Sequence, residues 1–126
     1  MIRIAIVEDE ESYISVLKEY LERYKKESGE QIEVTVYHDG DEIAAFYRAQ
    51  FDIILMDIEM KFIDGMTAAE EIRKVDSSVS IIFITNAPQY AIRGYEVGAL
   101  DYILKPVSYF TFSQKFGRAV AKIKKR

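Results

Sequence analysis

Short runs rich in Ile and Val alternate along this chain with longer stretches in which apolar residues recur every three or four positions. Five runs have the composition of β-strands: residues 2–7, 32–37, 52–57, 80–85 and 101–105. Strands that alternate with helical segments are typical of a parallel sheet with crossover helices. The alternation therefore predicts an α/β fold in which right-handed crossovers stack five β–α units into a doubly wound, five-stranded parallel sheet.

The pattern within each run indicates its place in the sheet. Residues 52–57 and 80–85 are apolar almost throughout, whereas residues 32–37 alternate between apolar and polar side chains. Continuous apolar strands are those covered on both faces, and alternating strands have one face exposed to water. We therefore expect the third and fourth strands in the middle of the sheet and the second nearer an edge.

The helical period predicts helices over residues 11–27, 41–49, 66–75, 89–97 and 108–124. In the second of these helices we expect Ile43, Phe46 and Tyr47 to face the core. In the fourth we expect the same of Ile92 and Tyr95.

The composition fits one folded domain of residues 1–126. With 49% apolar and 30% charged residues, a chain of 126 residues can bury about two-thirds of the surface that it exposes when unfolded. The net charge of −4 gives no reason to expect nucleic-acid binding by this segment itself, and the absence of Cys excludes disulfides and thiolate metal sites. No apolar run approaches the length of a membrane span, so we expect a cytoplasmic domain without membrane contact.

Polar side chains follow four of the five expected strands at the point where each strand ends. Glu8 and Asp9 follow the first strand, Asp57 ends the third, Thr85 the fourth and Lys105 the fifth. In an open parallel sheet, ligands bind beyond the carboxyl ends of the strands. We therefore expect these five side chains to gather at one edge of the sheet, far apart as they are in the sequence.

The charges at this edge point to a metal and to phosphoryl chemistry. Three carboxylates raise one another's pKa values unless cations neutralise them, and Lys105 supplies only one positive charge. A hard divalent cation such as Mg²⁺, which prefers oxygen ligands, is expected to supply the rest. Phosphoryl transfer depends mostly on positioning and charge neutralisation, and carboxylates form aspartyl-phosphates, so Asp57 is the expected nucleophile.

In these residues the chain resembles the receiver domain of two-component response regulators, the CheY-like superfamily, over nearly its whole length. The likeness rests on five features in order: the acidic pair Glu8–Asp9, "LMDIEM" around Asp57, "DG" at residues 64–65, Thr85, and "DYILKP" at residues 101–106. The resemblance implies a flavodoxin-like fold with strand order 2-1-3-4-5. It also implies a signalling domain that catalyses only its own phosphorylation and dephosphorylation.

The resemblance implies a role for each matching residue. Asp57 is expected to accept a phosphoryl group from a histidine kinase, and Lys105 to pair with that group. Asp9, Asp57 and the backbone carbonyl of Glu59 are expected to bind Mg²⁺, while Glu8 holds a water bound to the metal.

The resemblance also implies a conformational switch. Thr85 would turn its hydroxyl toward the phosphoryl group, and Tyr102 would move inward into the space that Thr85 leaves. The surface of the fourth helix, fifth strand and fifth helix would then change. Tyr90 and Arg93 lie near it, so this surface is the expected homodimer face.

The stretch "TNAPQYAIRGYEVGALDYILKP", residues 85–106, further resembles receivers attached to LytTR-type DNA-binding domains. DNA contact would then be made only by an output domain outside residues 1–126. Under this interpretation the chain is either an excised receiver or one that stands alone.

Four positions bear on how closely the chain follows the family. The peptide between Lys105 and Pro106 is expected to be cis, which is plausible because only X-Pro bonds adopt cis at low cost. Lys61 stands where the family usually has Pro, so the loop after Asp57 should be less rigid and carry an added cation. Glu59 and Ala87 occupy positions that in this family tune hydrolysis of the phosphoryl group.

Two other functions remain open from the residues alone. One is a Mg²⁺-dependent phosphatase with an Asp nucleophile, for which Asp57 and Glu59 would be the nucleophile and acid. Such enzymes need extra loops to hold a substrate, and this chain has none to spare. The other is an FMN binder, but the first strand is followed by the anionic "EDEES", which would repel phosphate.

Overall fold

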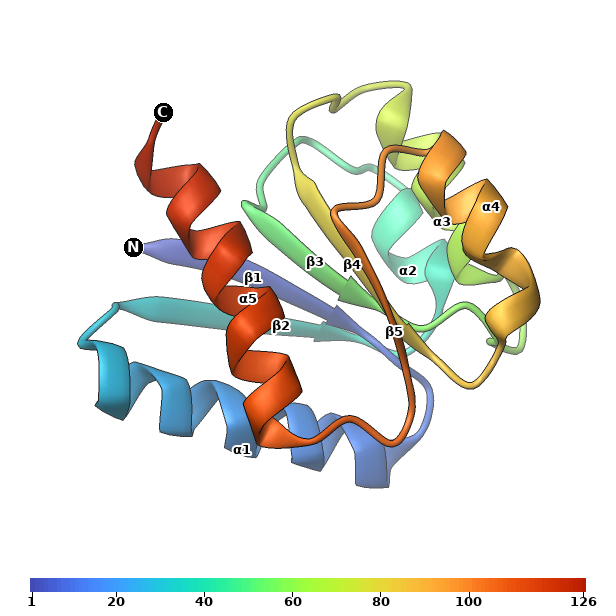
Figure 1. The fold of residues 1–126 in the computed structure, drawn as a ribbon. Helices are drawn as coiled ribbons and strands as arrows, with labels where there is room; N and C mark the ends of the chain where they lie inside the picture. Colours follow the sequence, from blue (N-terminus) through green and yellow to red (C-terminus); the bar gives the residue numbers. More distant parts are fainter.

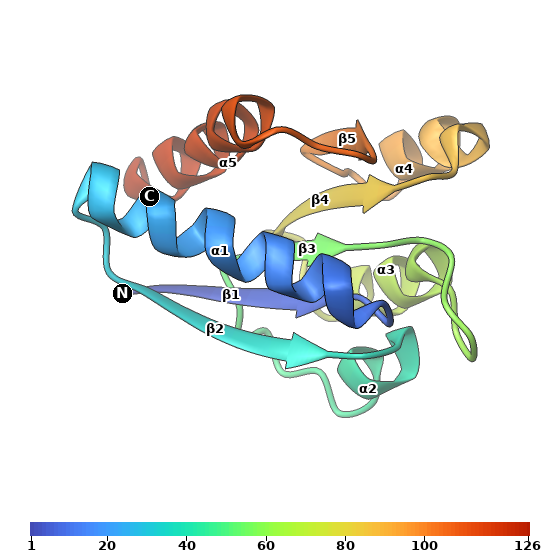
Figure 2. The ribbon, with the colours of Figure 1, turned by 90° about the horizontal axis from the view of Figure 1, so that it is seen from below.

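The computed structural model describes all of residues 1–126 as a five-stranded parallel sheet with helices on both faces. The strands are β1 (Ile2–Val7), β2 (Ile32–Tyr37), β3 (Ile53–Met56), β4 (Ser80–Thr85) and β5 (Asp101–Leu104). The helices are α1 (Glu11–Ser28), α2 (Gly40–Ala44), α3 (Gly65–Arg73), α4 (Ala91–Glu96) and α5 (Tyr109–Lys124), with a 3₁₀ turn over Pro88–Tyr90. The strand order is β2-β1-β3-β4-β5, as the family resemblance implied, and Figure 2 shows all five arrows pointing the same way.

The helices form two layers that enclose the sheet, with α1 and α5 over one face and α2, α3 and α4 over the other (Figure 1). Alternate side chains of β1 point toward the two helix layers. Ile4 and Ile6 pack with the apolar faces of α1 and α5, whereas Ala5 and Val7 pack with α2 and α3. Because successive side chains of a strand point to opposite faces, one strand can contribute to both cores.

The positions of the strands match those that the sequence indicated. Every residue of β3 and of β4 is buried, and both strands have a neighbour on each side. β2 is an edge strand in which only Ile32 is buried. The contrast between continuous and alternating apolar patterns therefore predicted the centre and this edge of the sheet.

The expected helix over residues 41–49 is wrong beyond Ala44, where α2 ends. Phe46 and Ala49 have positive φ angles of 60° and 57°, which are incompatible with a continuing right-handed helix. The turn leaves the Phe46 side chain 88% exposed instead of buried. It also directs Tyr47 inward, where its hydroxyl donates a hydrogen bond of 2.8 Å to Asp76.

The expected apolar stripe of the fourth helix is also wrong. Ile92 and Tyr95 are 76% and 86% exposed, and Gly94 is the only buried residue of α4. A Cβ atom on Gly94 would lie 3.2 Å from Tyr102 and 3.5 Å from Phe83. Because α4 approaches β4 and β5 through its glycine, its larger apolar side chains point away from the core.

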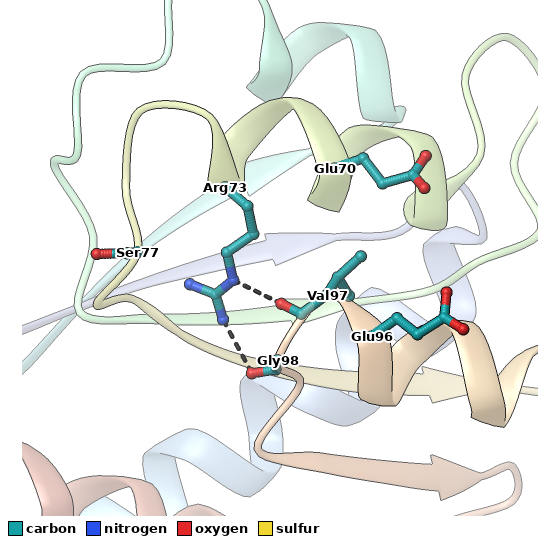
Figure 3. A pocket seen from close by; sticks show the side chains of 6 residues that line it. All are labelled: Glu70, Arg73, Ser77, Glu96, Val97 and Gly98. Carbon is teal, nitrogen blue, oxygen red and sulfur yellow. Dashed lines mark hydrogen bonds between the residues drawn. The ribbon is translucent and has the colours of Figure 1, made fainter.

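The largest hollow of the surface, about 580 Å³, lies between α3 and the connection from α4 to β5 (Figure 3). The Arg73 side chain lines it and donates hydrogen bonds to the backbone carbonyls of Asp76, Val79, Val97 and Gly98. Its guanidinium thus joins the α3–β4 connection to the α4–β5 connection. This hollow is not the site that the carboxylates form.

Both chain termini lie at the end of the sheet opposite the arrowheads (Figures 1 and 2). There the Arg126 side chain reaches Asp52, with 3.4 Å between the guanidinium nitrogen and the carboxylate oxygen. None of the helices combines the length and apolar character that crossing a bilayer requires.

Candidate functional site

The carboxyl ends of β1 and β3 bring three acidic side chains together. Val7 of β1 is in register with Met56 of β3, so the residues that follow each strand are neighbours. Carboxylate oxygens of Glu8, Asp9 and Asp57 all lie within 4.8 Å of one another. Glu8 and Asp57 are buried, whereas Asp9 is exposed, so the cluster opens to solvent on the Asp9 side.

Lys105 enters this cluster from the end of β5. Its ammonium lies 2.6 Å from a Glu8 carboxylate oxygen and 3.1 Å from Asp57 Oδ2, and all three side chains are at most 8% exposed. The backbone N–H of Lys105 donates to the Thr85 carbonyl at 2.8 Å, which continues the β4–β5 pairing past the end of β5. The Lys105–Pro106 peptide is cis, as expected.

The electrostatics of the cluster leave it short of positive charge. Burial, reinforced by the Asp57 charge, outweighs the hydrogen bond from Lys105 and raises the pKa of Glu8 to about 7. Burial alone would lower the pKa of Lys105, but the hydrogen bond to Glu8 and the Asp57 charge outweigh it and raise that pKa. One ammonium, which contacts Glu8 and Asp57, therefore serves a cluster of three carboxyl groups. A set of oxygen donors with excess negative charge suits a hard divalent cation.

Backbone contacts fix the orientation of the Asp57 side chain. Its Oδ1 accepts a hydrogen bond of 2.7 Å from the Ile58 N–H, while Oδ2 is the oxygen that faces Lys105. The Asp57 N–H donates to the Val7 carbonyl at 3.0 Å, and the Gly65 N–H donates to the Ile58 carbonyl at 2.8 Å. The carboxylate is thus held at the start of a closed loop that runs from β3 to α3.

Gly65→Ala is expected to destabilise the domain by about 1–3 kcal/mol, the usual cost of overpacking. A Cβ atom at residue 65 would lie 2.0 Å from the Asp57 carbonyl oxygen, and backbone atoms cannot yield as a side-chain tip does. Urea unfolding measures the loss. Gly117→Ala is the matched control, because its Cβ would meet only the Tyr24 hydroxyl at 3.7 Å and a helical Gly→Ala change should stabilise by about 0.5–1 kcal/mol. Equal stability of Gly65→Ala and the parent would contradict the close approach.

Asp39 makes two kinds of contact. It caps α2 by accepting a hydrogen bond from the Asp41 N–H. Its carboxylate also accepts hydrogen bonds of 2.9 and 2.8 Å from the N–H groups of Phe62 and Ile63 in the β3–α3 loop. Burial would raise the pKa of Asp39, but the backbone hydrogen bonds outweigh it and lower that pKa. An ionised side chain from the β2–α2 turn thus fastens the loop that begins at Asp57.

The exposed part of that loop carries Glu59 and Lys61. The Glu59 side chain is exposed, two residues after Asp57. The Lys61 ammonium lies 5.4 Å from the centre of the Phe62 ring and makes no ion pair with the carboxylate cluster. The Lys61 ammonium, which stands where the family usually has Pro, therefore faces an aromatic ring.

Thr85 and Tyr102 are connected through one residue, Ala87. Thr85, fully buried at the end of β4, accepts a hydrogen bond of 3.3 Å from the Ala87 N–H. The Tyr102 hydroxyl donates to the Ala87 carbonyl, and the Tyr102 ring packs 5.9 Å from that of Phe83. A movement of the Thr85 hydroxyl would therefore disturb the residue to which Tyr102 is bonded.

The sequence matches the response regulator receiver domain over residues 4–115. It is 36% identical over 110 residues to the transcriptional regulatory protein RprY of Bacteroides fragilis, and 33% identical over 108 residues to the sensory transduction protein LytT of Bacillus cereus. These alignments cover 85% and 84% of this chain but 44% and 42% of the relatives, so the chain spans less than half of their length.

A solved structure agrees with this match. The response regulator protein TrrA of Thermotoga maritima, in complex with Mg²⁺-BeF, is 29% identical to this chain with a TM-score of 0.79, over 94% of this chain and 99% of that one. The LytT relative supports a place in the LytTR-type subgroup. The matched segment contains every residue of the cluster described above, and the chain belongs to the family of response regulator receiver domains.

Proposed function

We propose that Asp57 accepts a phosphoryl group from a histidine kinase and that the domain switches its surface in response. The observation that carries this proposal is the arrangement of one ammonium and three carboxylates at the ends of β1, β3 and β5. Asp57 lies between Glu8, Asp9 and Lys105 and has one oxygen directed at the cation. A nucleophile in this setting has its charge partner already in place.

The donor set fits Mg²⁺. When all three acids are ionised, three carboxylates against one ammonium leave about two negative charges, and the exposed Asp9 keeps the site open to solvent. Asp9, Asp57 and the backbone carbonyl of Glu59 would hold the ion, and Glu8 would hold one of its waters. When bound, Mg²⁺ would neutralise charge on the phosphoryl oxygens. The complex of TrrA with Mg²⁺-BeF supports this assignment.

The chemistry of this chain's own residues follows from their positions. A carboxylate oxygen of Asp57 would form a bond to phosphorus while the bond from phosphorus to the donor imidazole breaks. Lys105, whose charge burial does not remove, would then pair with a phosphoryl oxygen. The hydrogen bond from the Ile58 N–H to Asp57 Oδ1 would keep the acyl group in the same orientation before and after transfer.

The switch would run from Thr85 through Ala87 to Tyr102. If the Thr85 hydroxyl turns toward the phosphoryl group, it gives up its bond to the Ala87 N–H. Ala87, whose carbonyl accepts the hydrogen bond from the Tyr102 hydroxyl, would then be free to move. The surface of α4, β5 and α5 carries exposed apolar side chains that suit a homodimer contact: Ile92, Tyr95, Leu104 and Phe110.

The output of the switch would be transcription. The chain covers 42% of the LytT relative, and a LytTR-type DNA-binding domain outside residues 1–126 would make the DNA contact. The receiver itself would occupy residues 1–126 and act in the cytoplasm, where it would meet its histidine kinase.

Incubation with acetyl phosphate and Mg²⁺, followed by intact-mass spectrometry, tests the proposal. We expect the mass of one added phosphoryl group, and no gain in mass when EDTA removes the metal. Turnover of added phosphomonoesters would instead favour a phosphatase. Absence of an adduct with both acetyl phosphate and phosphorylated kinases would contradict the proposal.

A further inference from the structure

Lys105 has a third neighbour, which comes from a helix outside the motifs of the site. Tyr13 lies in the first turn of α1, and the centre of its ring is 4.3 Å from the Lys105 ammonium. The same ammonium donates hydrogen bonds to Glu8 and Asp57. An ammonium has three N–H donors, and an aromatic face attracts a cation most strongly where water is excluded. Two carboxylates and one ring therefore surround this cation.

Tyr13 also contacts the backbone that follows Lys105. The buried Val107 donates its N–H to the Tyr13 hydroxyl at 3.0 Å, and the Tyr20 hydroxyl donates to the Val107 carbonyl at 2.8 Å. Tyr13 and Tyr20 are two helical turns apart, so both side chains lie on the same face of α1. The two phenols together satisfy both backbone polar groups of a residue that has little access to water.

We propose that Tyr13 is a positioning residue for Lys105. Its ring holds the ammonium toward Glu8 and Asp57, and its hydroxyl, with that of Tyr20, fixes the backbone two residues beyond the lysine. A lysine side chain is flexible and strongly hydrated, so an ammonium at the edge of an open site has a competing solvated position. The ring face disfavours that position because it replaces part of the hydration.

One consequence of this inference rests on the proposed function: a well-placed Lys105 ammonium should speed phosphorylation of Asp57. The contact between Tyr13 and Lys105 is independent of that function. Two measurements therefore separate the claims: one reports where the ammonium lies, and the other reports how fast phosphate is transferred.

The first measurement is the NMR chemical shift of the Lys105 CεH₂ protons in the full chain without phosphoryl donor. Protons over an aromatic face are shielded by the ring current. We expect these protons upfield of those of the exposed lysines in the parent protein, and the assignment follows from their absence in Lys105→Met. The upfield shift should persist in Tyr13→Phe, which keeps the ring, and disappear in Tyr13→Leu, which keeps only an apolar side chain.

The second measurement is the rate constant for phosphorylation by subsaturating acetyl phosphate with Mg²⁺. We expect a decrease of about tenfold in Tyr13→Leu, the effect of losing a desolvated cation–π contact. Tyr13→Phe and Tyr20→Phe each lose one hydrogen bond to Val107 and should fall by about threefold or less. In a Lys105→Met background, Tyr13→Leu should cause no further decrease, because Tyr13 acts through the lysine.

Tyr24→Phe is the matched control, since Tyr24 belongs to the same face of α1 but packs against Phe116, with ring centres 4.9 Å apart. It should leave both the shift and the rate unchanged. An unaltered Lys105 shift in folded Tyr13→Leu would overturn the inference, as would a lost shift with an unaltered rate. If the parent protein shows the shift but accepts no phosphate, the proposed function fails while the contact stands.

Discussion

Asp57→Asn is expected to leave the domain folded and to abolish its phosphorylation by acetyl phosphate and Mg²⁺. An amide is a poor nucleophile that forms no aspartyl-phosphate. Asn nevertheless has the shape of Asp, and its oxygen can accept the Ile58 N–H that Asp57 Oδ1 now accepts at 2.7 Å. Lys105 keeps its contact of 2.6 Å to Glu8. Intact-mass spectrometry should detect one added phosphoryl group in the parent and none in the variant.

The same substitution should stabilise the metal-free protein. Asp57 is one of the charges that raise the pKa of Glu8, so its removal lowers the repulsion within the cluster. Urea unfolding in EDTA should therefore give a higher midpoint for Asp57→Asn than for the parent. Asp64→Asn is the matched control from the same loop. Asp64 caps α3 through a hydrogen bond of 2.7 Å from the Thr67 N–H, and Asn is an equally good cap, so phosphorylation and stability should both persist. An adduct that survives in Asp57→Asn would place the acceptor elsewhere.

The site could be predicted from the sequence because a parallel sheet converts the order of strands into proximity. Glu8, Asp57 and Lys105 each follow an apolar run, and the ends of those runs necessarily meet at one edge. The excess of negative charge could be predicted as well, because three acids and one lysine were expected at this edge. The same logic assigned β3 and β4 to the middle of the sheet.

The features that the sequence did not predict depend on packing between segments. Periodicity shows that a helix has an apolar stripe but not which face packs against the sheet. In α4 the face with Gly94 packs against Tyr102, so Ile92 and Tyr95 are exposed. The exposure of Phe46 depends on a turn with positive φ angles, and the sequence has no Gly at these positions that would indicate such a turn.

The contacts that support the site are hidden from sequence reasoning for a similar reason. Asp39 and Tyr13 have ordinary local explanations, as a helix cap and as part of an apolar stripe. Their second partners, the Phe62 N–H and the Lys105 ammonium, are 23 and 92 residues away in the chain (62 − 39 and 105 − 13). No spacing rule connects such positions, because contacts between separate elements depend on how those elements pack in the fold.

Lys105→Met is expected to destabilise the metal-free domain by about 3–5 kcal/mol near neutral pH, the cost of removing one partner from a buried ion pair. Met keeps the apolar stem but leaves Glu8 and Asp57, which are 2% and 8% exposed at their side chains, without a cation. Urea unfolding in EDTA measures the loss. Added Mg²⁺ should restore part of the stability, because a bound ion supplies the missing positive charge.

The pKa of Glu8 determines how this loss depends on pH. Burial, with the Asp57 charge, raises that pKa from 4.5 in the unfolded chain to about 7 in the folded protein, despite the hydrogen bond from Lys105. An acid of this kind binds more protons when folded, so the stability falls as pH rises from 4.5 to about 7. Without Lys105 the folded-state pKa of the acid rises further and the fall continues to higher pH. The difference between variant and parent should therefore be smaller at about pH 5 and largest above about pH 8.

Lys115→Met separates this effect from the loss of any lysine charge. Lys115 lies 3.2 Å from an Asp101 carboxylate oxygen, but its side chain is 37% exposed, and surface ion pairs contribute about 1 kcal/mol or less. The stability of Lys115→Met should differ little from that of the parent, and this difference should not grow with pH. If Lys105→Met loses the same stability at both pH values and gains none from Mg²⁺, the loss reflects how the Met side chain packs and not a missing charge. The carboxylate cluster would then have no charge deficit for a metal to correct.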